Sequence, residues 1–252
     1  MNAPLSNRLR ALLRSIAASV YHAINATLTV LAACETAFQC GMVGSMDVTI
    51  DEQRTTTGPR MMRLFVALET NDAMRQAVVA AQQTLRQRGD LPVRWTKPEH
   101  AHLTLQFLGN VMTTHIPSLT DALSAATAPH SAFMLREGVV GAFPALDAPR
   151  VLWLGMRSAV DALRALHQSV AEALRQVEGI VADRKPFQPH LTLGRVRNGH
   201  RDAPGTNALV AALRRPVAVP PAGWPIAHVS LIRSVLGAGG PRYTTMERFS
   251  VR

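Results

Sequence analysis

The tetrapeptide His102-Leu103-Thr104-Leu105 recurs later in the chain as His190-Leu191-Thr192-Leu193. Successive side chains of an extended strand alternate between its two faces, so each His and the Thr two positions later point the same way. The leucines point the other way, into a core. Each copy therefore predicts a strand that offers one imidazole and one hydroxyl to a common face.

Two such strands brought together would place two imidazoles and two hydroxyls at one site. Histidine titrates near neutral pH, so one ring can be neutral while the other is protonated. The neutral ring can take a proton from an attacking water or hydroxyl, and the charged ring can give one to the leaving oxygen on the far side of a phosphorus. The threonine hydroxyls can donate hydrogen bonds to the non-bridging phosphate oxygens. Arg195, five residues after His190, would add a positive charge near the same strand end.

Strand and helix signals run through the chain from Met62 onward. We expect strands at 63–68, 93–95, 102–108, 133–143, 150–156, 190–196, 226–236 and 242–251. Helical spacing predicts helices over 72–85, 115–127, 158–174 and 207–213, the first capped by Thr70, Asn71 or Asp72 and the third by a Ser158/Asp161 capping box. The order strand, helix, strand thus runs twice, with one His-x-Thr strand in each run. This pattern favours an α+β fold with largely antiparallel sheets and two lobes that face each other across a cleft.

Composition narrows the class of protein. The chain has 252 residues, 47% of them hydrophobic, which suits one large or two small cores. The net charge of +10 comes mostly from arginine, because Lys97 and Lys185 are the only lysines. Arginine matches phosphate geometry and favours a polyanionic partner, although a genome rich in arginine codons would give the same excess. Both cysteines, Cys34 and Cys40, precede Met62, so we expect a reducing cytoplasm and no disulfide or thiolate zinc site in the body.

The first 60 residues differ in character from the rest. We predict that residues 1–60 are an extension, disordered or not native, with translation beginning at Met61 or Met62, and that residues 61–252 form the functional domain. Two alternatives stay open: a signal or lipid anchor, since Leu31-Ala32-Ala33-Cys34 resembles a lipoprotein cleavage box, and an arginine-rich transit peptide. No run of about 18 uninterrupted apolar residues occurs, so we expect no membrane span.

A metal centre is the main competing interpretation of the histidines. His100, His102 and His190 would be its ligands, but the chain lacks the His-Glu-x-x-His spacing, and no carboxylate closely accompanies the second motif. No Gly-x-x-x-x-Gly-Lys-Ser/Thr loop is present, and Gly237 to Gly240 is best explained as a hairpin turn. We therefore expect neither a metal nor another cofactor.

The chain from Met62 to its end resembles the 2H phosphoesterase superfamily, and within it the bacterial and archaeal RNA 2′,3′-cyclic phosphodiesterases, also called 2′-5′ RNA ligases. The two His-Leu-Thr-Leu motifs carry the resemblance, and flanking segments narrow it to that family. These segments are Arg63-Leu-Phe-Val-Ala-Leu68, Arg94-Trp95, Pro98-Glu99, Gln106-Phe-Leu-Gly109, Gly141-Ala-Phe-Pro144, Arg150-Val-Leu-Trp-Leu-Gly155, Pro186-Phe-Gln-Pro189, Gly194-Arg195 and Arg242-Tyr-Thr244.

The resemblance implies a two-lobed, pseudo-symmetric fold with antiparallel sheets lining a central cleft and helices outside. It implies hydrolysis of RNA 2′,3′-cyclic phosphate ends to 2′-phosphates, with His102 as proton donor and His190 as proton acceptor. Thr104, Thr192 and Arg195 would hold the phosphate. It also implies a minor, reversible 2′-5′ ligation of RNA, with tRNA fragments among the partners. We expect a monomer that binds no membrane. Two alternatives remain: a phosphodiesterase for small cyclic nucleotides or ADP-ribose cyclic phosphate, and a non-catalytic RNA-binding module.

Overall fold

Two strand–helix–strand units form the framework of the structure, a computed structural model that describes residues 60–181, 183, 185–197, 205–237 and 240–252. The units are β1 (Met61–Glu69), α2 (Asp72–Arg86) and β3 (His102–Met112), then β5 (Val151–Met156), α4 (Val160–Arg175) and β6 (His190–Val196). Each unit ends in a strand that begins with its His-x-Thr motif, as predicted. The predicted extension over 1–60 lies outside this description apart from Arg60, and so do Cys34 and Cys40.

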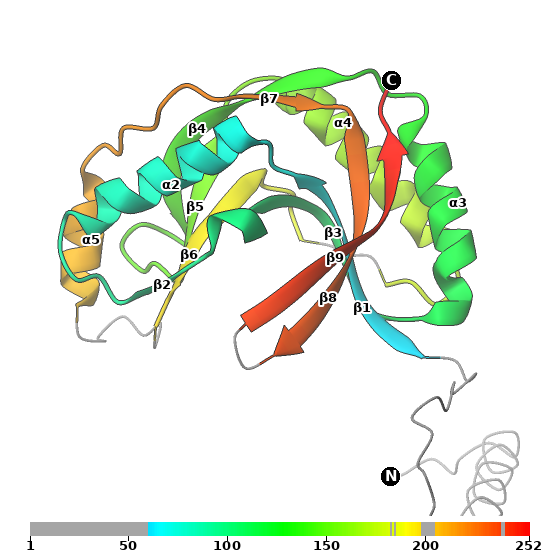
Figure 1. Cartoon of the computed structure of the whole chain (residues 1–252), viewed down its shortest axis with the longest axis horizontal. Coiled ribbons are helices and arrows are strands. Elements are labelled where there is room, and N and C mark those ends of the chain that lie inside the picture. The colour runs from blue at the N-terminus through cyan, green and yellow to red at the C-terminus, as the bar shows by residue number, and fades with distance from the viewer. Residues whose placement is uncertain (1–59, 182, 184, 198–204, 238–239) are drawn as a thin grey trace, which may run out of the picture. The chain divides into compact units, whose positions relative to one another are not determined.

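The strands of the described residues pair antiparallel in one curled, nine-stranded sheet (Figure 1). The other strands are β2 (Val93–Trp95), β4 (Phe133–Phe143), β7 (Gly223–Ile226), β8 (His228–Gly237) and β9 (Gly240–Ser250). The order is β7-β4-β5-β6-β3-β1-β8-β9, with β2 paired to β6. The motif strands β3 and β6 are therefore neighbours at the middle, and the two lobes are the two halves of a single sheet. The predicted α+β class is confirmed.

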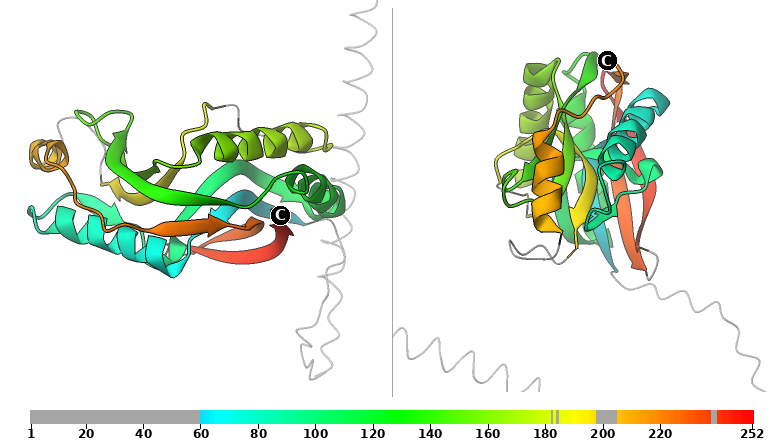
Figure 2. Two further views of the ribbon diagram at one scale, coloured as in Figure 1. Left: turned by 90° about the horizontal axis from the view of Figure 1, so that it is seen from above. Right: turned by 90° about the vertical axis from the view of Figure 1, so that its left-hand side faces the viewer.

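Helices α2 and α4 each cover the half of the sheet that does not contain the strand preceding them in the sequence. Helix α2 follows β1 but packs against β4, β6 and β7, whereas α4 follows β5 but packs against β3. Helix α3 (Ile116–Thr127) packs on α4 and β9, and α5 (Thr206–Arg214) lies near β2 at the other end (Figure 1). The two views of Figure 2 place α2 and α4 on opposite sides of the strands. Within the described ranges, no helix is long and apolar enough to cross a membrane.

The two predicted helix caps have different outcomes. Asn71 caps α2, because its side-chain oxygen accepts a hydrogen bond of 2.9 Å from the backbone N–H of Met74. The predicted capping box at Ser158 and Asp161 is wrong. Helix α4 begins after Ala159, which is in the left-handed region at φ 49° and makes no side-chain cap. The Ser158 hydroxyl instead donates to the carbonyl of Met134 on β4, 3.1 Å away.

The predicted strand 226–236 is two strands. Strand β7 pairs with β4, and β8 pairs with β1 and β9, so the chain passes from one half of the sheet to the other at Ala227. The Ala227 carbonyl accepts a hydrogen bond from the Val251 N–H there. The apolar pattern continues across Ala227, and for this reason it did not reveal the change of partner. Pro225 fits because β7 is an edge strand, where a missing N–H is tolerated.

Candidate active site

The two motifs meet side by side on β3 and β6. Leu103 lies directly opposite Leu191 in the antiparallel ladder, and both side chains are fully buried. Counting outward from this pair puts His102 and Thr104 opposite Thr192 and His190, all on the face away from the leucines. These four side chains are partly exposed, whereas the four leucines of the motifs are buried. The structure thus brings the predicted imidazoles and hydroxyls to one face.

Both imidazoles are held in the same way. The Nδ1 of His102 lies 2.8 Å from the carbonyl oxygen of His100, and the Nδ1 of His190 lies 2.7 Å from that of Gln188. A carbonyl oxygen only accepts, so Nδ1 carries the hydrogen in both rings. The Nε2 atom of each neutral ring is then free to accept a proton, and in the charged ring it is free to donate one.

Aromatic side chains support each ring. Phe65 on β1 and Tyr243 on β9 flank His102, with ring centroids 4.8 and 5.2 Å away, and Tyr243 meets it edge-on. Phe143 on β4 meets His190 edge-on at 4.9 Å. Such contacts fix the planes of the rings and keep water from their sides.

A bulge follows the Thr of each motif. Thr104 pairs with Ala67 and Gln106 with Val66, so Leu105 has no partner of its own. Likewise Thr192 pairs with Trp153 and Gly194 with Leu152, which leaves out Leu193. The extra residue reverses the alternation of faces beyond it.

The second bulge places Arg195 on the face of the histidines. Strict alternation would direct a residue five positions after His190 to the opposite face. After the bulge, Arg195 pairs with Val151, which shares a face with Trp153, the partner of Thr192. Gly194 makes this possible, since a Cβ there would lie 2.5 Å from Cγ1 of Val93 and 3.1 Å from the Arg94 carbonyl oxygen. In the first motif the corresponding residue is Phe107, which pairs with Phe65.

Burial and neighbouring charges set the proton affinities of the site. Burial lowers the pKa of His102, and so do the charges of His100 and His190, against the hydrogen bond to His100 and the charge of Glu69, which raise it. Burial also lowers the pKa of His190, which the hydrogen bond to Gln188 raises and the Arg195 guanidinium lowers. Burial raises the pKa of Tyr243, against the positive charges of Arg195 and Arg63. Arg195 therefore acts electrostatically on both halves of the site.

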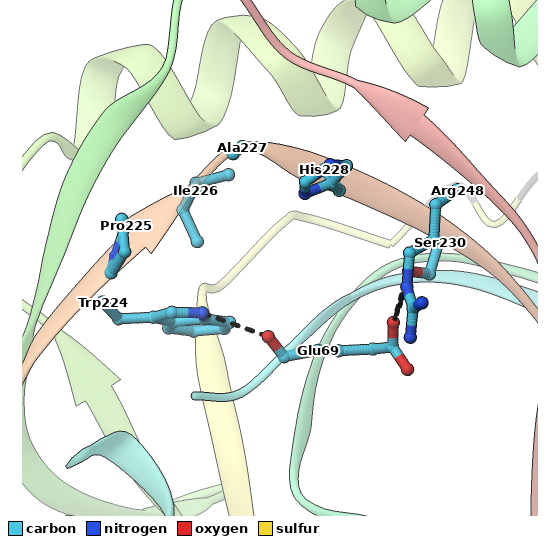
Figure 3. A pocket seen from close by; sticks show the side chains of 8 residues that line it. All are labelled: Glu69, Trp224, Pro225, Ile226, Ala227, His228, Ser230 and Arg248. Carbon is cyan, nitrogen blue, oxygen red and sulfur yellow. Dashed lines mark hydrogen bonds and ion pairs between the residues drawn. The ribbon is translucent and has the colours of Figure 1, made fainter. Parts of the chain in front are cut away.

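Glu69 is a polar component of the site that the sequence interpretation missed. It pairs directly with His102 in the β1–β3 ladder. Its carboxylate accepts hydrogen bonds from the hydroxyls of Ser230 at 2.8 Å and Thr245 at 2.7 Å and from Arg248 Nε at 2.9 Å. The carboxylate lines a cavity of about 230 Å³, and the Trp224 indole donates to the Glu69 backbone carbonyl there (Figure 3). The sequence contained one signal for Glu69, because it is an acidic residue at the end of an otherwise apolar strand.

The alternative interpretation of the histidines was a metal site with His100, His102 and His190 as ligands. His100 lies edge-on to Tyr243, with 5.2 Å between the ring centroids. Among the residues that the structure describes, no group of three His, Cys, Asp or Glu side chains is arranged to hold a metal ion.

Duplicated His-x-Thr strands on a curled antiparallel sheet define the class of 2H phosphoesterases. The chain belongs to the 2′-5′ RNA ligase superfamily, whose family profile matches residues 72–238. It is 36% identical over 200 residues to the RNA 2′,3′-cyclic phosphodiesterase of Thermus thermophilus, covering 76% of this chain and 91% of that protein. It is 28% identical over 193 residues to the RNA 2′,3′-cyclic phosphodiesterase of Aquifex aeolicus, covering 75% of this chain and 97% of that protein. Its fold is similar to the crystal structure of the Thermus thermophilus protein TT0787, with TM-score 0.61, 30% identity, and 76% of this chain and 98% of that one covered.

Proposed function

We propose that this enzyme hydrolyses the 2′,3′-cyclic phosphate at RNA ends to a 2′-phosphate and a free 3′-hydroxyl, without a metal ion. The observation that carries the proposal is the pair of His-x-Thr motifs on adjacent strands, with each imidazole held through Nδ1 and its Nε2 free. Relatives named RNA 2′,3′-cyclic phosphodiesterase support the substrate class. The charge of +10, mostly from arginine, suits RNA.

The reaction is an in-line displacement at phosphorus. Nε2 of His190 takes a proton from water as the water oxygen bonds to phosphorus. The bond from phosphorus to the 3′ oxygen breaks on the opposite side, and Nε2 of protonated His102 gives that oxygen its proton. The products are the 2′-phosphate and the 3′-hydroxyl, and exchange with solvent restores both rings. Each proton transfer of this kind typically supplies about 10²–10⁴-fold in rate.

Three further side chains hold the phosphate in this proposal. The hydroxyls of Thr104 and Thr192 donate to its non-bridging oxygens, and Arg195 adds a full positive charge. The in-line transition state concentrates negative charge on those oxygens, and preorganised donors stabilise it more than the ground state. The bulge that turns Arg195 to the histidine face supports its role.

In ligation an RNA 5′-hydroxyl replaces water as the nucleophile. His190 takes the proton of this hydroxyl as its oxygen bonds to phosphorus, and protonated His102 gives a proton to the leaving 3′ oxygen. The two proton roles are exchanged only in the reverse reaction, in which the 3′-hydroxyl cleaves the 2′-5′ linkage. We propose ligation as a minor activity, with tRNA fragments among the RNA partners. We further propose that the functional domain spans 61–252 and acts as a monomer in the cytoplasm.

Turnover in the presence of a chelator tests the proposal. The full chain, treated with EDTA, is assayed on an oligonucleotide that ends in a 2′,3′-cyclic phosphate. We expect full activity and a 2′-phosphate product; loss of turnover that added metal restores would overturn the metal-free mechanism. A nucleoside 2′,3′-cyclic phosphate and ADP-ribose cyclic phosphate serve as comparison substrates. Faster turnover of either would redirect the substrate assignment, and salt-sensitive RNA binding without product would indicate a binding module instead.

A further inference from the structure

The two motifs are built alike but have different cross-strand partners. Glu69 on β1 lies opposite His102, and Gly155 on β5 lies opposite His190. Directly opposed residues of an antiparallel pair share a face, with Cα atoms about 4.5–5.5 Å apart. A carboxylate therefore shares the face of one imidazole, whereas the residue opposite the other imidazole has no side chain of its own.

Packing explains why the second half has glycine at this position. A Cβ on Gly155 would lie 3.0 Å from Cζ3 of Trp153, which is tighter than most real Cβ contacts. The same indole lies over Gly141 on β4, where a Cβ would approach Cζ2 to 2.3 Å. The position of the Trp153 indole on this half of the sheet thus leaves little room for a side chain at position 155 beside His190.

We propose that Glu69 breaks the near-symmetry of the two motifs and assigns proton donation to His102. This inference rests on the proposed function, and it gives the direction of proton flow a structural cause that the duplicated motifs lack. Glu69 acts through His102 and is a positioning residue rather than a catalytic one. An ionised carboxylate stabilises a neighbouring imidazolium, whereas the Arg195 guanidinium destabilises one at His190.

The surroundings of Glu69 keep it charged and in place. Burial raises its pKa, but hydrogen bonds from Arg248, Thr245 and Ser230 and the charge of Arg248 outweigh burial, so the pKa of Glu69 is below its usual value. Ser230 is only 1% exposed, so the carboxylate has a buried hydroxyl as one of its donors. Arg248, which contacts Glu69 in Figure 3, is 59% exposed in its side chain, and for that reason water screens part of its opposing charge.

Other titratable or charged groups surround His102 and Glu69. His100 precedes His102 in the chain, His190 comes from β6 and Tyr243 from β9, and Arg248 on β9 contacts Glu69. When charged, His100 and His190 oppose protonation of His102, and Arg248 opposes it through its contact with Glu69. The hydrogen bond to the His100 carbonyl and the charge of Glu69 both favour the protonated ring. His190 has the equivalent hydrogen bond to Gln188 but no such carboxylate, so removal of Glu69 should be felt specifically at the proton donor.

The pH dependence of kcat/KM in the full chain tests this inference. The acceptor must be neutral and the donor protonated, so the acidic limb reports His190 and the alkaline limb reports His102. Glu69→Gln keeps the shape and removes the charge, so the alkaline limb should move to lower pH while the acidic limb stays. The ratio of kcat/KM at pH 8 to that at pH 6 should fall roughly 3–10-fold. Glu69→Asp should restore the wild-type profile, and Glu172→Gln on the exposed face of α4 is the matched control for loss of one carboxylate.

A second variant changes the profile in the opposite direction. Arg248→Gln removes the cation that offsets Glu69, so the alkaline limb should move to higher pH. It also carries the test if Glu69→Gln fails to fold. An unchanged alkaline limb in either folded variant, or a shift of the acidic limb instead, would overturn the inference. Absence of cyclic-phosphate hydrolysis by the wild-type chain would overturn the proposed function itself, which separates the two failures.

Discussion

The half of the sheet around His102 and the half around His190 share a backbone design and differ in their side chains. Both have a His-x-Thr strand, a bulge after the Thr and an Nδ1 bonded to a carbonyl two residues earlier. A phenylalanine packs against each imidazole, but the first half adds a carboxylate and a tyrosine, and the second adds an arginine. The duplicated backbone places two equivalent rings at one site, and we propose that the unequal side chains give these rings the separate roles of proton donor and proton acceptor.

Removal of either imidazole should have the largest effect, because in the proposed mechanism each ring carries out one of the two proton transfers. His102→Ala and His190→Ala should each lower kcat/KM by about 10²–10⁴-fold. The double variant should lose little more than the worse single variant, because residues that act as one unit are strongly non-additive. His115→Ala, at the far end of β3 in the 3-10 turn Thr113–His115, is the matched control. Wild-type turnover in either single variant would remove that residue from the mechanism.

Arg195 tests the charge that belongs to the second half. Arg195→Gln should lower kcat/KM by about 10–100-fold, which corresponds to the roughly 1.5–3 kcal/mol of a charged hydrogen bond. The guanidinium lowers the pKa of His190, so its removal raises the pKa of the acceptor. The acidic limb of kcat/KM should therefore move to higher pH. A shift of the alkaline limb alone would place Arg195 beside the wrong ring.

Gly194 tests the bulge that turns Arg195 to the histidine face. Gly194→Ala puts a Cβ against Val93 and the Arg94 carbonyl, and overpacking of this kind costs about 1–3 kcal/mol of unfolding free energy. Chemical denaturation measures the loss of unfolding free energy, and an activity assay measures the change in kcat/KM that follows if Arg195 is displaced. Gly223→Ala is the control, since its Cβ would meet Met134 Sδ at an ordinary 3.4 Å. Equal stability of the two variants would contradict the close packing of β2 on β6.

The threonines should show the smallest and most similar effects. Thr104→Val and Thr192→Val each remove one neutral donor with little change in shape, which is worth about 1 kcal/mol or about 5-fold in kcat/KM. Similar losses would support equivalent hydroxyls in the two halves. A loss confined to one of them would show that the phosphate sits on one half of the site.

The sequence predicted the elements that depend on local patterns. Alternation of His, Leu, Thr and Leu predicted which face each motif side chain occupies, and the Asn71 cap followed from its place before an apolar helical stripe. Where the outcome depends on partners, prediction was weaker. The apolar run through Ala227 does not show that β7 and β8 belong to different halves, and Ser158 bonds to β4 instead of its own helix.

The site residues also divide into those set by local sequence patterns and those set by strand pairing. The histidines and threonines were readable because their spacing is local. Glu69 was missed because its place beside His102 depends on pairing with a strand more than 30 residues away in the sequence. Arg195 was found by resemblance and by its nearness to the motif, but the bulge that turns it to the correct face depends on pairing with β5. Gly194 was the one sequence signal of that bulge.

The most direct test of the central claim is a crystal structure of the full chain with a nucleoside 2′-phosphate product. We expect a single phosphate with one oxygen about 2.6–3.2 Å from Nε2 of His190 and the ribose 3′-hydroxyl at the same distance from Nε2 of His102. A phosphate bound against one ring, with the other ring facing solvent or a separate ligand, would contradict the account.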